Sequence, residues 1–251
     1  MILSISRVKL FKACRRAYEL KYIEGLEPVT QAEALVTGQT YHSKLEELYN
    51  TGDFDASDLS KESAMATAYK KYIYPKFNVL YAEGWEDCPL GKHKLIGRVD
   101  GLTDDGRLVE HKTTSLDPAE YEFNLQWDEQ ILAYMAMTGT RKVCYTVCRK
   151  PTIRKKKNES DEDFFNRMVE WYDEDTDSKL ALLELSRTDE EIDTFIDQLK
   201  KTADDMENPS CYYRNTTYCR AWGRQCEYAS VCLNYDPSQE YVEFTRRKRE
   251  E

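Results

Sequence analysis

The sequence predicts an α/β fold, because segments of helical period surround a short region of strand character. Residues 33–52 and 189–206 are typical of amphipathic helices. Between them, residues 97–114 alternate apolar and polar side chains on both sides of an Asp-Asp-Gly turn, which predicts a β-hairpin. Residues 142–151 are rich in Val, Thr, Tyr and Cys and predict a further strand. Strands enclosed by helices indicate an α/β domain.

The N-terminal part is predicted to be helical. A first helix is expected over residues 4–25, started by a serine N-cap and ended near a glycine. Its apolar positions recur at three- and four-residue steps: Val8, Phe11, Cys14, Tyr18 and Tyr22. A second helix is expected over residues 33–52 and a third over 61–77, broken by Pro75.

The remainder continues this mixture of elements. An amphipathic run over residues 124–139 follows the hairpin, and a charged segment, 154–163, precedes helical runs at 163–175 and 189–206. The sequence contains no internal repeat and no evident linker, so we expect a single domain over residues 1–251. Its parts would be a helical part (1–90), a hairpin with helix and strand (91–150), a charged loop with helices (151–205) and a cysteine-rich segment (206–251).

Composition excludes several classes of protein. The chain has 251 residues and a formal net charge of −10, and it contains no apolar run long enough for a membrane span or a signal peptide. We therefore expect a soluble, cytoplasmic protein that does not bind membranes. The acidic balance argues against nonspecific coating of nucleic acid but allows a local basic groove.

The hairpin carries an unusual combination of charges. Glu110 and Lys112 share one face of a strand while His111 points the other way, and the turn brings Asp100 near the same end. Two adjacent carboxylates repel each other unless a cation relieves them. Mg²⁺ prefers such oxygen ligands and can supply a water that attacks a phosphodiester, which Lys112 could position. The alternative is an exposed edge hairpin with a simple salt bridge.

In these residues the sequence resembles the PD-(D/E)XK nuclease superfamily, and further motifs are similar to its RecB-like branch. The acidic residue and E-x-K motif correspond to Asp100, Glu110 and Lys112, although Val-Asp stands where Pro-Asp is usual. The segment "TGQTYHSKLEELY" looks like the helix that carries the branch's metal-binding histidine, here His42. The segment "QILAY" fits the Q-x-x-x-Y motif. Taken alone, His42 could equally form a surface pair with Glu46, and "QILAY" could be an ordinary amphipathic helix.

The resemblance implies a restriction-endonuclease-like core, with a mixed central β-sheet flanked by helices. It implies a Mg²⁺- or Mn²⁺-dependent deoxyribonuclease, an exonuclease on single-stranded DNA ends in recombination, repair or CRISPR-linked processing, where partner proteins are possible. His42, Asp100, Glu110 and the carbonyl of His111 would hold the metal, and Lys112 would act on the attacking water. The alternative is a catalytically weak nucleic-acid-binding or regulatory protein on the same scaffold.

The cysteines are a separate feature of the sequence. Cys219, Cys226 and Cys232 lie close together, whereas Cys14 stands near the N-terminus. Four thiolates suit an iron–sulfur cluster or a tetrahedral zinc. Some RecB-like nucleases join their ends through one N-terminal and three C-terminal cysteines around a [4Fe-4S] cluster, and the resemblance favours that cofactor here. Six residues separate Cys219 from Cys226 where two are usual, which leaves open zinc, or Cys211 as a substitute ligand; plain buried thiols are the further alternative.

Residues that could contact DNA lie in two places. Gln130 and Tyr134 belong to the Q-x-x-x-Y motif, and a basic run supplies flexible cations for phosphate contacts: Arg154, Lys155, Lys156 and Lys157. The run could equally be a solvated loop. Cys88, Cys144 and Cys148 have no partner in the cluster scheme, and the last two are expected to be small core residues of a strand.

Overall fold

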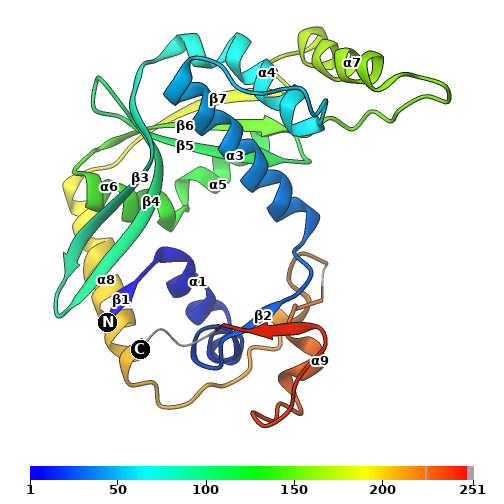
Figure 1. Ribbon diagram of the computed structural model, residues 1–251. Helices are drawn as coiled ribbons and strands as arrows, with labels where there is room; N and C mark the ends of the chain where they lie inside the picture. The colour runs from blue at the N-terminus through cyan, green and yellow to red at the C-terminus, as the bar shows by residue number, and fades with distance from the viewer. Residues whose placement is uncertain (224, 248–251) are drawn as a thin grey trace. The chain divides into compact units, whose positions relative to one another are not determined.

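The computed structural model of the protein describes residues 1–223 and 225–247 and combines one large sheet with helices (Figure 1). Its strands are β1 (Ile2–Leu3), β2 (Leu26–Pro28), β3 (Val79–Leu90), β4 (His93–Thr103), β5 (Leu108–Thr114), β6 (Lys142–Arg149), β7 (Leu180–Ser186) and β8 (Phe244–Arg246). Its α-helices are α1 (Ile5–Ala13), α2 (Arg15–Tyr18), α3 (Glu33–Thr51), α4 (Lys61–Tyr72), α5 (Tyr121–Gln126), α6 (Glu129–Thr138), α7 (Asp161–Glu174), α8 (Asp189–Glu207) and α9 (Ala229–Cys232). Short π- and 3₁₀-helical turns occupy Glu19–Ile23, Tyr74–Lys76, Pro118–Glu120 and Tyr218–Gly223. In the described part of the chain no helix combines the length and the apolar character that a bilayer crossing requires.

The chain divides into two compact units. The first combines Met1–Ala32, Pro89–Ile96 and the chain from Ile196 onward, and the second combines Glu33–Cys88 with Gly97–Phe195. The second unit contains the hairpin and all the side chains expected around the nuclease metal. The first unit contains the four cysteines expected to share a ligand site.

The large sheet is mixed. Its strand order is β1-β4-β5-β6-β7, with β3 paired to β4. The β4–β5 and β6–β7 pairs are antiparallel, whereas β5 and β6 run parallel in a continuous register from Leu108↔Val143 to Thr114↔Arg149. A parallel pair requires a crossover, and α5 and α6 supply it. The predicted α/β class with a mixed central sheet is confirmed.

Helices cover both faces of β5–β7 (Figure 1). The core under α3 and α4 joins Leu48, Met65 and Tyr69 to the small side chains of Cys144 and Cys148 on β6. Both cysteines are at most 1% exposed, the place expected for small core residues of a strand. On the other face, α6 begins where the Asp128 carboxylate accepts a hydrogen bond from the Gln130 N–H. The helices that carry His42 and Gln130 are thus fixed against the sheet.

Among the elements that differ from the expectation are the first helix and two strands of the large sheet. The first helix is interrupted at Cys14, whose backbone is extended, because the C-terminal segment takes over hydrogen bonds there: Arg16 N–H donates to the Tyr213 carbonyl. Strands β3 and β7 were not predicted. The run "LALLELS" of β7 is short and mostly apolar, and periodicity alone cannot distinguish such a run from a buried helical turn.

Candidate active site

The β4–β5 hairpin brings Asp100 to Glu110. Gly101 pairs with Val109 and Leu102 with Leu108, and one further step in this register places Asp100 opposite Glu110. The Asp100 Oδ2 atom accepts a 2.6 Å hydrogen bond from the His111 N–H, which fixes the carboxylate across the strand. Both acidic side chains are buried, Glu110 with only 1% exposure.

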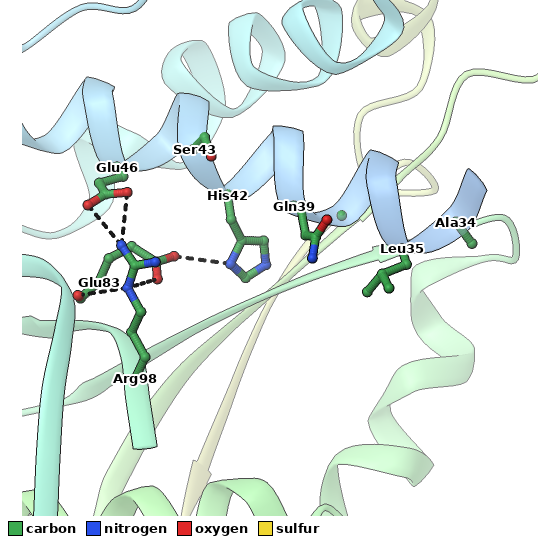
Figure 2. A pocket seen from close by; sticks show the side chains of 9 residues that line it. Ala34, Leu35, Gln39, His42, Ser43, Glu46, Glu83 and Arg98 are labelled. Carbon is green, nitrogen blue, oxygen red and sulfur yellow. Dashed lines mark hydrogen bonds and ion pairs between the residues drawn. The ribbon is translucent and has the colours of Figure 1, made fainter. Parts of the chain in front are cut away.

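His42 reaches this hairpin from α3. Its Nδ1 atom lies 3.4 Å from Asp100 Oδ1 and 3.2 Å from Glu83 Oε1, and its Nε2 atom lies 3.1 Å from the His111 carbonyl oxygen. Figure 2 shows the imidazole directed away from the helix, with the Glu83 carboxylate beside it. Ligand atoms of His42, Glu83 and Asp100 all lie within 4.8 Å of one another, a spacing that one metal ion can bridge. Glu46, the alternative partner of His42, instead bonds Arg98.

Glu110 has a spare oxygen. Its Oε1 atom accepts from Lys112, whereas Oε2 is buried and has no hydrogen-bond partner among the described residues. Leaving a buried polar atom unsatisfied costs about 1–3 kcal/mol, and more for a charged group. A divalent cation held by Asp100, Glu110 and His42 would satisfy that oxygen, and carboxylate and carbonyl oxygens with one imidazole suit Mg²⁺ or Mn²⁺. The residues present therefore fit the metal that the hairpin predicted.

The ionisation of these groups reflects the same crowding. Burial and the neighbouring Asp100 raise the pKa of Glu110 to about 7, although Lys112 opposes the shift. Burial would also raise the pKa of Asp100, but the nearby His42 lowers it to about 2. Burial alone would lower the pKa of His42, yet Asp100 and Glu83 raise it to about 10. The imidazole thus lies among acceptors, the two carboxylates and the His111 carbonyl, that could also face a metal ion.

Lys112 is held by a chain of side chains. Its ammonium group donates to Glu110 and lies 3.2 Å from Gln130 Oε1, while Gln130 Nε2 donates to the Tyr134 hydroxyl at 2.9 Å. Burial would lower the pKa of Lys112, but the attraction of Glu110 raises it, so the side chain stays cationic. Gln130 and Tyr134, which the sequence assigned to DNA contact, orient this ammonium group. Their contact with DNA remains a prediction.

Gly97 allows α6 to approach the sheet closely enough for this chain to form. A Cβ atom at Gly97 would lie 2.8 Å from the Tyr134 ring and 2.8 Å from Met137 Cε, closer than carbon atoms approach in proteins. Any larger residue at this point of β4 would push α6 outward. The position of Tyr134 therefore depends on a glycine of the hairpin strand.

His111 contributes its backbone and not its ring. The ring lies on the opposite face of β5 from Glu110, as strand alternation predicts, and its Nδ1 atom is 2.7 Å from Thr146 Oγ1. Burial lowers the pKa of His111 to about 3, so the ring is neutral. Its carbonyl oxygen faces His42 and is available as a metal ligand.

The basic run lies beyond the end of β5. The Lys150 N–H donates to the Thr114 carbonyl at 2.7 Å. The loop therefore begins beside Thr114, which is the last residue of β5 and lies two residues after Lys112. Lys155 pairs with Asp161, and Arg167 donates to the Arg154 carbonyl. Four cationic side chains of the loop are exposed: Arg154, Lys155, Lys156 and Lys157. Phosphate contact by these residues remains a prediction.

Comparison with known proteins identifies the family of the chain. The sequence model of the PD-(D/E)XK nuclease superfamily matches residues 2–73 and 67–233. The chain belongs to the PD-(D/E)XK nuclease superfamily. No curated protein matches the sequence. The crystal structure of SSO0001 matches with 14% identity over 92% of this chain and 86% of that chain, at a TM-score of 0.50.

Two other solved structures are similar to this nuclease chain. The alkaline exonuclease LHK-Exo from Laribacter hongkongensis matches with 17% identity over 82% of this chain and 89% of that chain, at a TM-score of 0.36. A phage-related exonuclease from Haemophilus somnus 129PT matches with 14% identity over 79% and 96%, at a TM-score of 0.37.

The four cysteines of the predicted cluster lie in the first unit. Cys14 is buried, and Cys226 and Cys232 pack against the same apolar cluster. The Asn215 N–H points at Cys14 Sγ over 3.5 Å, and the Cys226 N–H donates to the Cys219 carbonyl at 2.9 Å. Burial raises the pKa of Cys226, and the thiols of Cys14 and Cys219 add to the shift, because all three lie in one neighbourhood. Cys211, the candidate substitute ligand, is exposed.

We expect His42→Ala to weaken Mn²⁺ binding more than Mg²⁺ binding, because Mn²⁺ accepts an imidazole ligand more readily. The ratio of the Mn²⁺ affinity to the Mg²⁺ affinity should therefore fall by about 10-fold, because loss of one group around a metal typically changes affinity on that scale. Calorimetric titration of both ions into wild type and variant measures this. An unchanged ratio of the two affinities would remove His42 from the set of metal ligands.

Proposed function

We propose that the protein is a Mg²⁺- or Mn²⁺-dependent deoxyribonuclease. The observation that carries the proposal is the buried, unpartnered Oε2 atom of Glu110 beside Asp100 and a fixed Lys112. In the proposal, four groups hold the metal: His42, Asp100, Glu110 and the His111 carbonyl. When bound, the ion polarises the phosphodiester and lowers the pKa of a water molecule. Lys112, kept cationic, orients that water and offsets the charge that develops on the phosphate.

The finer proposal is an exonuclease that acts on single-stranded DNA ends. The histidine helix and the Q-x-x-x-Y motif, both similar to the RecB-like branch, support it. The basic loop after β6 supports DNA as the substrate, because its exposed cations can neutralise backbone phosphates. The same proposal places this activity in recombination, repair or CRISPR-linked DNA processing.

The decisive experiment is cleavage of single- and double-stranded DNA labelled at the 5′ or the 3′ end. We expect single nucleotides or short products from single-stranded substrate with Mg²⁺ or Mn²⁺, and none with EDTA. Protein that binds Mn²⁺ and DNA but cuts neither substrate would contradict the enzyme and favour the regulatory alternative. Internal cuts in circular single-stranded DNA would overturn the exonuclease part alone.

We further propose that Cys14, Cys219, Cys226 and Cys232 hold a [4Fe-4S] cluster. Their common neighbourhood in the first unit supports one shared site, and the amide that points at Cys14 Sγ is the kind of hydrogen bond that tunes such clusters. Among the described residues, the groups of three ligand atoms within 4.8 Å consist of histidines and carboxylates. Zinc bound by the same four thiolates is the alternative that metal analysis distinguishes.

A further inference from the structure

We propose that Glu83 is an additional ligand of the catalytic divalent cation, a carboxylate that neither the E-x-K motif nor its acidic partner includes. The inference rests on the proposed metal-dependent function and concerns how this chain completes the site. Three observations carry it: the direction of the carboxylate, the conformation of the backbone and the arginine that holds the side chain.

The Glu83 carboxylate faces the same point as Asp100. Its Oε1 atom lies 3.2 Å from His42 Nδ1, the nitrogen that also lies 3.4 Å from Asp100 Oδ1. The Glu83 side chain is only 10% exposed, so it is not a surface acid that happens to lie nearby. The buried Glu110 Oε2, which has no hydrogen-bond partner among the described residues, indicates independently that the site suits a cation. One ion there would contact Glu83, Asp100 and His42 together.

The backbone is shaped to turn Glu83 into the site. Glu83 lies in the middle of β3 with φ +53°, a left-handed conformation that costs a non-glycine residue about 1–2 kcal/mol. The next residue must be glycine, because a Cβ atom at Gly84 would lie 2.3 Å from the Tyr81 ring. Tyr81 is held over that glycine by a hydrogen bond from its hydroxyl to Glu86. Such strain persists where the surroundings enforce it, and it concentrates at functional sites.

Arg98 fixes the second oxygen of Glu83. The Arg98 Nε atom lies 3.0 Å from Glu83 Oε2, and Arg98 Nη2 bonds both oxygens of Glu46 at 3.1 and 3.2 Å. Figure 2 shows the guanidinium between the two carboxylates. Because Glu46 lies one helical turn after His42, the arginine ties Glu83 to the helix that carries the histidine. Oε2 is thus engaged, and Oε1 remains directed at the metal position.

The proposed ligand is accessible to an ion. A cavity of about 540 Å³ reaches His42 and Glu83, and its remaining lining is formed by Ala34, Leu35, Gly38, Gln39, Ser43, Glu46 and Arg98. A hydrated cation can enter through it, which a metal site requires. Arg98 offsets part of the added negative charge, so a third carboxylate does not overload the site.

The test is Mn²⁺ binding to the full-length protein without DNA, measured by calorimetry. Glu83→Gln keeps the size of the side chain and its capacity to bond Arg98 but removes the anionic ligand. We expect an affinity about 10- to 100-fold weaker than wild type. Asp87→Asn removes the same charge from an exposed position of the same strand and should leave the affinity unchanged. Glu83→Asp keeps the charge but shortens the side chain by one methylene, so we expect an intermediate loss of Mn²⁺ affinity. This variant replaces Glu83→Gln in the test if the glutamine variant does not fold.

A double-mutant comparison separates a ligand from a residue that only orients His42. If Glu83 binds the ion, Glu83→Gln still weakens Mn²⁺ binding when His42 is already alanine. If it acts only through the imidazole, the second substitution has no further effect, and the inference is overturned. Wild-type affinity in folded Glu83→Gln, with binding lost in Asp100→Asn, overturns it equally. Wild-type protein that binds no Mn²⁺ would instead refute the proposed function, and with it the ground for this inference.

Discussion

Lys112→Ala is expected to lower the rate of DNA cleavage about 1,000-fold while leaving Mn²⁺ affinity within a few-fold of wild type. The ammonium group lies next to Glu110 but is not a metal ligand, so its loss should affect the charge that develops during the reaction and not the binding of the ion. Burial would lower the pKa of Lys112, but Glu110 raises it above its usual value, so the group is cationic at neutral pH. Single-turnover cleavage of end-labelled DNA, with Mn²⁺ titration of the same samples, measures both quantities.

Two further variants make the Lys112 result interpretable. Gln130→Ala keeps the ammonium group but removes the oxygen that orients it, so a smaller loss, about 10-fold, is expected. Lys142→Ala removes an exposed lysine from the neighbouring strand and should leave the rate unchanged. Full activity in folded Lys112→Ala would exclude the hairpin as the catalytic element. Loss of Mn²⁺ binding in the same variant would show that Lys112 mainly supports the two carboxylates.

The sequence predicted the parts of the site that depend on regular periodicity. Strand alternation places Glu110 and Lys112 on one face, and the turn places Asp100 opposite them. The three side chains indeed adjoin one another in the structure. The role of His42 was predicted only from the resemblance to the RecB-like branch, because one histidine on an amphipathic helix has no distinctive pattern of its own. Its distance from the hairpin is set by packing of α3 on the sheet, which sequence spacing does not encode.

Glu83 shows what periodicity cannot reveal. Its side chain reaches the site only because one residue of β3 leaves the extended conformation. A single departure of this kind does not alter the apolar pattern of a strand, and β3 itself was not predicted. One local signal was present, since an isolated glycine within a strand often marks a bulge or a close approach of another group, as at Gly84.

The first helix illustrates the same limit in the other unit. Apolar spacing through Cys14 predicts one continuous helix, yet Cys14 itself is extended. The cause lies 201 residues later, where Asn215 donates one hydrogen bond to the Ala13 carbonyl and another to Cys14 Sγ. A contact so distant in sequence cannot be read from local propensity. It places the thiol of Cys14 toward the C-terminal cysteines, and this gives the cluster proposal its structural basis.

Cys14→Ser is expected to abolish iron content and to lower the melting temperature by about 10 °C or more. A cluster held by Cys14 and Cys232 closes a loop of nearly the whole chain, and cross-links that close loops this long stabilise by about 4–5 kcal/mol. For a chain of this size each kcal/mol corresponds to about 2–4 °C. Cys232→Ser should behave in the same way. Protein purified without oxygen should be brown, with iron and acid-labile sulfide in equal amounts.

The remaining cysteines supply matched controls for this experiment. Cys88→Ser removes a partly buried thiol from the other unit and should leave iron content unchanged. Cys211→Ser tests whether Cys211 is a ligand in place of Cys219. If this variant loses iron and Cys219→Ser retains it, Cys211 replaces Cys219 in the ligand set. Stoichiometric zinc without iron would keep the link between the chain ends and discard the cluster. Neither metal in anaerobically prepared protein, with Cys14→Ser as stable as wild type, would mean that the four thiols are ordinary buried side chains. The chain ends would then be linked by the β2–β8 strand pair, the Asn215 hydrogen bonds and apolar packing.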